Sequence, residues 1–142
     1  QPEVVMGALQ NLGAESEAAY MALAAHMSNP TTVKVQINNT VFLYNYAKDV
    51  KVPRAICYLY NLDTTEQLPT NIFKFLRKVQ RRGIPKIIFI SKDGNFLRAF
   101  LAILPKLKKY GTNGAIVENQ EKKVFLARVD FGTKKLALQG KQ

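Results

Sequence analysis

Apolar and polar residues alternate with a period of two over the first half of the chain. The alternation runs through residues 33–37 and resumes after Asn38-Asn39. Asn tolerates the positive φ of a tight turn, so residues 32–46 are predicted to form a β-hairpin. A third alternating run, residues 54–60, adds a strand, and the three strands favour an antiparallel meander.

The apolar period then becomes helical. Apolar residues recur at intervals of three and four from Ile72 to Val79, which predicts a helix with Thr70 as its N-cap and Gly83 at its end. The short apolar run Lys86–Ile90 is typical of a strand covered on both faces. Strand, helix and strand in this order predict a β-α-β crossover.

A second amphipathic helix is predicted from Phe96 to Leu107, with Leu101 on its apolar face and a kink or restart at Pro105. Residues 115–117 and 124–131 are predicted to form a final antiparallel hairpin.

This element order predicts an α/β (α+β) fold with one mixed, mostly antiparallel sheet and flanking helices. Residues 1–30 are interpreted as a helical segment of the same domain, 31–131 as the α/β core and 132–142 as a basic, solvated tail. A chain of 142 residues buries enough surface to fold as one domain without disulfides or metals.

Positive charge is concentrated in one part of the chain. The sequence has 21 Lys and Arg against 10 Asp and Glu, a formal charge of +11. Residues 71–86 contain six of these cations and no acidic residue. Such a field attracts phosphate backbones, anionic cofactors or an acidic partner surface.

The cations of the first predicted helix form a stripe opposite its apolar face. The candidate residues for binding an anion or nucleic acid are Lys74, Arg77, Lys78, Arg81 and Arg82, with Lys106, Lys108 and Lys109 as an extension. The alternative is an ordinary solvated face, although such a face usually mixes charge signs. Four tyrosines are candidates for stacking on bases, but are more often sheet or core residues: Tyr44, Tyr46, Tyr58 and Tyr60.

Most catalytic constellations are absent from the sequence. The single Cys57 excludes an internal disulfide and is typical of a core residue, and the single His26 makes a conventional zinc site improbable. There is no Walker loop or nucleophile elbow, so neither a catalytic residue nor a metal ligand is assigned. No apolar run would span a membrane and no signal peptide is visible. The expected localisation is cytoplasmic or virion-associated, and the start at Gln1 leaves open whether residues precede it.

The order of elements resembles the GCN5-related N-acetyltransferase (GNAT) fold over residues 2–131. The segment Lys92–Phe96 and the step Tyr110-Gly111 are similar to the family's Asn-led helix and its aromatic-Gly end. The resemblance implies an acetyl-coenzyme A cleft between strands 54–60 and 86–90.

Two departures from the family pattern concern its chemistry. The interval 61–70, where a Gly-rich pyrophosphate loop is expected, has no Gly and contains Asp63 and Glu66. Leu101, Ala102 and Ile103 lie near the place of the family's Tyr general acid. The resemblance therefore implies a degenerate, non-catalytic member, of a kind that occurs among bacteriophage proteins.

Three functions remain open on the sequence. The first is a non-enzymatic structural or binding protein whose basic surface contacts nucleic acid or an acidic protein, with no cofactor, within a larger assembly, a homo-oligomer or a phage particle. The alternative is an N-acetyltransferase that uses acetyl-CoA through an atypical loop. The third is an architectural subunit whose charge serves solubility.

Overall fold

The computed structural model describes residues 25, 28–121 and 123–138, so most of the predicted segment 1–30, including His26, lies outside the described residues. The elements are β1 (Val33–Ile37), β2 (Thr40–Ala47), β3 (Arg54–Asn61), α3 (Leu68–Arg81), β4 (Lys86–Ser91), α4 (Gly94–Lys109), β5 (Asn113–Asn119) and β6 (Val124–Asp130).

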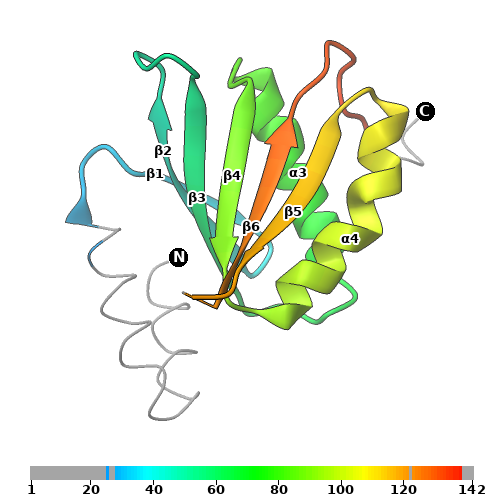
Figure 1. Ribbon diagram of the computed structural model, residues 1–142. Coiled ribbons are helices and arrows are strands. Elements are labelled where there is room, and N and C mark those ends of the chain that lie inside the picture. The colour runs from blue at the N-terminus through cyan, green and yellow to red at the C-terminus, as the bar shows by residue number, and fades with distance from the viewer. Residues whose placement is uncertain (1–24, 26–27, 122, 139–142) are drawn as a thin grey trace.

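One six-stranded sheet organises the chain, in the order β1-β2-β3-β4-β6-β5. Strands β3 and β4 are parallel and every other neighbouring pair is antiparallel. Helices α3 and α4 lie together on one face of the sheet (Figure 1). This confirms the predicted α/β single domain with a mixed, mostly antiparallel sheet and a β-α-β crossover.

A cluster of aromatic rings fills the space between the helices and the sheet. Phe42 of β2 stacks on Phe75 of α3, with ring centroids 4.0 Å apart. Phe89 of β4 meets Phe75 edge to face at 5.9 Å and Phe96 of α4 at 5.5 Å. All four side chains are fully buried. Such pairs add about 0.5–1.5 kcal/mol each beyond the burial of apolar area, and they fix α3 against the sheet.

The strand Lys86–Ile90 was predicted to be buried on both faces of the sheet, but only one of its faces is fully buried. Ile87 and Phe89 point toward the helices and are fully buried, whereas Ile88 and Ile90 on the other face are only partly buried. Among the described elements both helices cover the same face, which accounts for this difference.

Three predicted helix details also need correction. Thr70 is not an N-cap, because α3 begins at Leu68 and Pro69 occupies its first turn, where a missing N–H has no cost. Helix α4 runs unbroken from Gly94 to Lys109 with Pro105 inside it, which excludes the restart, one of the two predicted effects of this proline. Leu101 is 50% exposed and does not belong to the buried face of α4.

The segment 131–138, here called the strap, is not a solvated tail. It lies against the helices, and Leu136 is fully buried. The side-chain amide of Gln80 in α3 donates to the carbonyls of Gly132 (3.1 Å) and Lys134 (2.9 Å) and accepts from the backbone N–H of Leu136 (2.8 Å). The prediction of a solvated tail is therefore wrong for the strap, which is fixed along α3.

Candidate functional site

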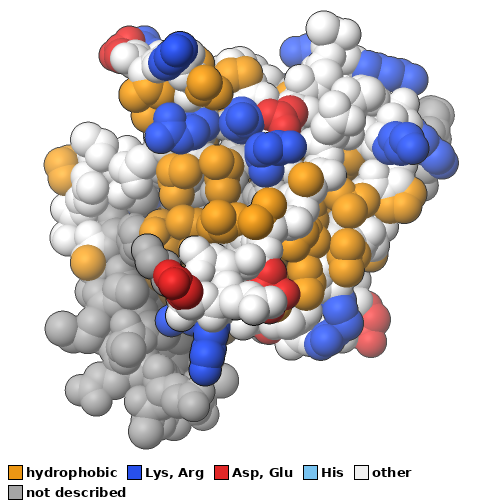
Figure 2. All heavy atoms as spheres, in the orientation of Figure 1, with side chains coloured by type: hydrophobic (Ala, Val, Ile, Leu, Met, Phe, Trp, Pro, Cys, Tyr) orange, Lys and Arg blue, Asp and Glu red, His pale blue; other side chains and the backbone are white. Residues whose placement is uncertain are grey.

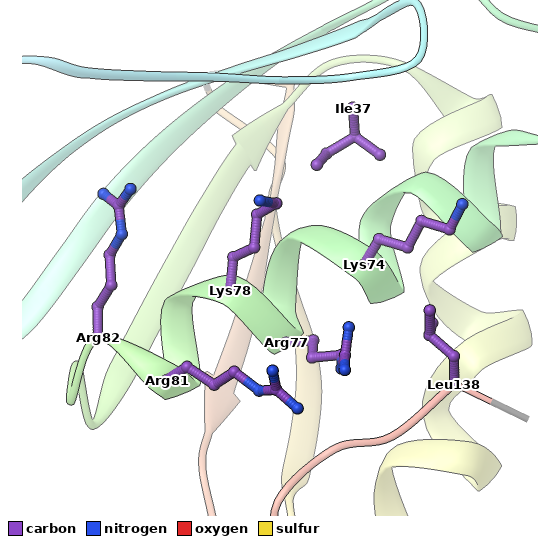
Figure 3. A pocket seen from close by; sticks show the side chains of 7 residues that line it. All are labelled: Ile37, Lys74, Arg77, Lys78, Arg81, Arg82 and Leu138. Atoms are coloured by element: carbon purple, nitrogen blue, oxygen red, sulfur yellow. The ribbon is translucent and has the colours of Figure 1, made fainter. Parts of the chain in front are cut away.

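A cationic groove lies on the outer face of α3 (Figure 3). Its volume is about 390 Å³, and it is lined by all five cations that the sequence placed on this helix: Lys74, Arg77, Lys78, Arg81 and Arg82. Two apolar side chains of the described part of the chain, Ile37 and Leu138, also line it.

The periodicity of α3 explains why these cations converge. Residues three and four apart share one side of a helix, and the opposite side of α3 is anchored by the buried Ile72, Phe75 and Val79. Lys74 and Arg82 are eight residues apart, which corresponds to about 12 Å along the helix axis. The five cations therefore form an elongated binding site along the helix rather than a compact site for a single anion.

The two apolar side chains come from different parts of the chain. Ile37 is the last residue of β1, and Leu138 is the last described residue of the strap. Figure 3 shows Ile37 on one side of α3, with Lys74 and Lys78, and Leu138 on the other side, with Arg77 and Arg81. A hairpin end and the strap thus form the two walls of the groove.

No acidic residue neutralises the groove within the described ranges. The ion pairs found there join Asp130 to Lys86 (3.6 Å) and to Arg128 (2.9 Å), both away from the groove. Arg82 Nη1 donates to the hydroxyl of Tyr44 at 2.9 Å, a neutral acceptor. The Nε atom of Arg77 is buried and has no hydrogen-bond partner among these residues.

The three cations predicted to extend the stripe do not line the groove. Lys106 Nζ lies 4.0 Å from the ring centroid of Phe73, in a cation–π contact between α4 and α3. Lys108 and Lys109 are exposed in the last turn of α4, where cations interact favourably with the helix dipole. The structure therefore unites five of the eight predicted residues.

The four candidate tyrosines do not form a stacking surface at the groove. Tyr44 is only 2% exposed and belongs to the core, so its role as a stacking residue is excluded. Tyr58 and Tyr60 lie on β3, on the opposite sheet face from the fully buried Ala55 and Cys57. Burial, and secondarily the neighbouring Tyr58, raises the pKa of Tyr60 to about 12.

The loop between β3 and α3 is occupied by a hydrogen-bonded network. Asn71, fully buried in α3, donates to Asp63 Oδ2 (2.7 Å) and to Thr40 Oγ1 (2.9 Å), and accepts from Asn38 (2.7 Å). Asp63 Oδ2 also accepts from the backbone N–H of Asn39 at 2.9 Å. The carboxylate of Asp63 thus accepts from the hydrogen-bond donors near the start of α3. A pyrophosphate would need such donors and would be repelled by this carboxylate, so the place does not suit one.

Cys57 is fully buried at the centre of β3, and burial raises the pKa of its thiol. A neutral, inaccessible thiol is not a nucleophile, in line with its interpretation as a core residue. Among residues 25, 28–121 and 123–138, no group of three or more His, Cys, Asp or Glu side chains could hold a metal ion. No helix in the same part of the chain is long and apolar enough to cross a membrane.

The sequence missed the two walls and the residues that hold them. Ile37 was assigned only to a strand, and Leu138 to a tail. The available signal was the alternation of Leu136 and Leu138 within a polar segment, which is the pattern of a segment with one buried side. The role of Gln80 could not be predicted from the sequence, because this residue is buried only where the strap packs against α3.

Comparisons with protein-family models, with curated proteins and with solved structures find no match for this chain. The acetyltransferase resemblance therefore stays a prediction, and the function is argued from the groove itself.

Proposed function

We propose that this protein binds the phosphate backbone of a nucleic acid strand in the α3 groove and is not an enzyme. The observation that carries the proposal is the convergence of five Lys and Arg side chains on one groove with no acidic partner among the described residues. Cations that are brought together without counter-charges repel one another, and a polyanion removes that repulsion.

The dimensions of the groove fit one strand. Successive phosphates along a single strand lie farther apart than the 3.4 Å axial rise of a duplex strand, so the roughly 12 Å between Lys74 and Arg82 accommodates about three phosphates. Among the residues that the structure describes, Ile37 and Leu138 are the apolar side chains that line the groove, and neither offers a ring for stacking on a base. Binding through the backbone alone makes the expected recognition independent of base sequence.

An acidic protein surface is the weaker candidate ligand. Protein interfaces usually bury an apolar or aromatic centre with a polar rim, whereas this groove is cationic along its length. Three of its five cations are arginines, whose planar guanidinium groups can donate two parallel hydrogen bonds to the oxygens of a phosphate. Competition by polyglutamate at equal charge concentration would favour the protein surface instead.

The direct test replaces Arg77, Lys78, Arg81 and Arg82 together with Glu. We expect the variant to lose binding of a twelve-residue thymidine oligonucleotide, measured by fluorescence anisotropy at about 150 mM salt. The matched control reverses four exposed cations that do not line the groove: Lys34, Lys92, Lys108 and Lys109. Circular dichroism checks that both variants fold, and equal losses in the two variants would contradict the proposal.

The acetyltransferase alternative has its own test. Calorimetric titration with acetyl-CoA at about 200 mM salt, with ATP as an anionic control, separates a built cofactor site from a general attraction. The carboxylate network at Asp63 leads us to expect no selective binding of acetyl-CoA. Selective micromolar binding would restore the enzyme hypothesis.

A further inference from the structure

Tyr46, near the end of β2, has an aromatic ring that solvent reaches. Of the four tyrosines that the sequence offers for stacking on bases, Tyr46 is the exposed one, at 36%. Tyr44 is buried, and Tyr58 and Tyr60 are partly buried. The ring of Tyr46 is therefore open to a ligand from outside.

The alternation of β2 determines the face on which Tyr46 lies. Tyr44 points toward the helices, because its ring packs edge to face on Phe75 of α3, with centroids 5.9 Å apart. Tyr46 follows two residues later on the same strand, so it lies on the same face, about 7 Å beyond Tyr44. Its cross-strand partner on β3 is Ala55, which is fully buried. Tyr46 thus shares the face of the sheet that carries α3 and the groove.

Arg82 connects this position with the groove. It follows directly after α3 and lines the groove, and its Nη1 donates to the hydroxyl of Tyr44 at 2.9 Å. Strand β2 and helix α3 finish at the same end of the sheet (Figure 1), so Tyr46 lies just beyond the point where the helix stops. A ligand that follows the groove past Arg82 therefore reaches the ring of Tyr46 next.

The loops at the two ends of the groove differ in charge. The loop before α3, at the end where Lys74 lies, carries two acids and no cation: Asp63 and Glu66. The segment that follows Tyr46, residues 48–54, carries three cations and one acid: Lys48, Lys51, Arg54 and Asp49. A polyanion that extends beyond the groove is therefore attracted toward Tyr46 and repelled at the other end.

We propose that Tyr46 stacks on a base of the strand whose phosphates lie in the groove, so that the ligand is single-stranded at this place. The inference rests on the proposed function, since the base belongs to the bound strand. A base inside a duplex presents only its edges in the grooves, whereas an unpaired base offers its face to an aromatic ring. Every base has such a face, so the contact adds affinity without reading the sequence.

An oligonucleotide without bases provides the test. A twelve-residue abasic strand keeps the phosphates of the thymidine oligonucleotide but has nothing to stack on Tyr46. One base stacked on an aromatic ring corresponds to roughly tenfold in affinity, so the wild type should bind the abasic strand roughly tenfold more weakly in fluorescence anisotropy. Tyr46→Ala should lose the same factor for the thymidine strand and should bind the two strands nearly equally.

Two control variants isolate the ring. Tyr46→Phe keeps it and should bind both strands as the wild type does. Val117→Ala is the matched control for the loss of an exposed apolar side chain, because Val117 is 58% exposed on β5, at the far edge of the sheet, and it should also bind as the wild type does. The salt dependence of Tyr46→Ala should equal that of the wild type, since the lost contact carries no charge.

The other outcomes separate the stacking from the proposed function. Equal binding of the thymidine and abasic strands by the wild type would overturn the stacking and leave the proposed function intact. A preference for thymidine that survives in Tyr46→Ala, or a loss in this variant that is as large for the abasic strand, would overturn the assignment of Tyr46. Binding of neither strand by the wild type would overturn the proposed function, and the stacking with it.

Discussion

The buried amide of Asn71 joins three separate segments of the chain. Its nitrogen donates to Asp63 and Thr40, while its oxygen accepts from Asn38 and from Gln67 (3.1 Å). All of its hydrogen-bonding capacity is used at a fully buried position. A polar residue in this setting specifies how the β1–β2 turn and the loop before α3 meet.

Asn71→Asp tests this network with an almost unchanged shape. The variant loses two donors and sets a carboxylate against Asp63, whose Oδ2 is 2.7 Å from the nitrogen it replaces. We expect a loss of about 2–4 kcal/mol in unfolding free energy at pH 7, measured by urea denaturation. Part of the loss should be recovered as the pH is lowered, because protonation of one carboxyl removes the repulsion between two adjacent like charges. A loss that does not depend on pH would exclude the carboxylate pair as its cause.

Tyr60 makes the stability depend on alkaline pH. Its pKa is raised from 10 to about 12 by burial and by Tyr58. The folded state therefore holds this proton more firmly than the unfolded state does, so the stabilisation is complete below pH 10 and is lost as the pH rises to 12. In urea titrations, Tyr60→Phe should show a smaller decrease in stability between pH 10 and 12 than the wild type. Identical pH profiles would contradict the assigned cause.

At the scale of elements, the strap and α3 build the groove together. Gly132 starts the strap where a Cβ atom would meet the backbone carbonyl of Gly111 more closely than real Cβ atoms approach. Its backbone N–H donates to Thr112 Oγ1 at 3.1 Å. The strap therefore has little freedom to move away without loss of the wall at Leu138.

Gly132→Ala should displace the strap, lowering the stability by about 1–3 kcal/mol and weakening oligonucleotide binding. Gly94→Ala is the control, because a Cβ there would lie 3.7 Å from Arg98, an ordinary contact, and alanine is favoured in a helix. Thermal denaturation and anisotropy give both readings. If the Gly132→Ala variant binds the oligonucleotide as tightly as the wild type, the strap does not contribute to binding in the groove.

The helices, the strands and the strap show which features of the groove could be predicted from the sequence. The five cations of α3 were predictable, because their side of the helix follows from the apolar period of residues 72–79. The turn at Asn38 was predictable as well, and its φ of 52° confirms the left-handed conformation that Asn tolerates. The walls at Ile37 and Leu138 were not predictable, since they meet only through tertiary contacts of the hairpin and the strap.

Over the whole molecule, charge is separated between the two ends of the sheet. Both helices finish at the same end (Figure 1), and the cations of their last turns and of the adjoining loops gather there: Lys78, Arg81, Arg82, Lys106, Lys108, Lys109, Lys48, Lys51, Lys134 and Lys135. Blue side chains mark part of this end in Figure 2. The same end also holds Asp49 and Asp130, and the loops at the opposite end carry the acids Asp63, Glu66, Asp93 and Glu121 beside Lys92 and Lys123, so the excess of positive charge lies at the first end. This asymmetry orients an approaching polyanion toward the end where α3 finishes.

The central claim is that the α3 groove neutralises the phosphates of one strand. The most direct measurement is the affinity for a single-stranded oligonucleotide over a series of salt concentrations, for the wild type and for the variant with Glu at 77, 78, 81 and 82. Contact with about three phosphates predicts a slope of about −2 in a plot of log affinity against log salt concentration, and the variant should lose this dependence. A flat wild-type plot, or the same slope in the variant, would contradict the account.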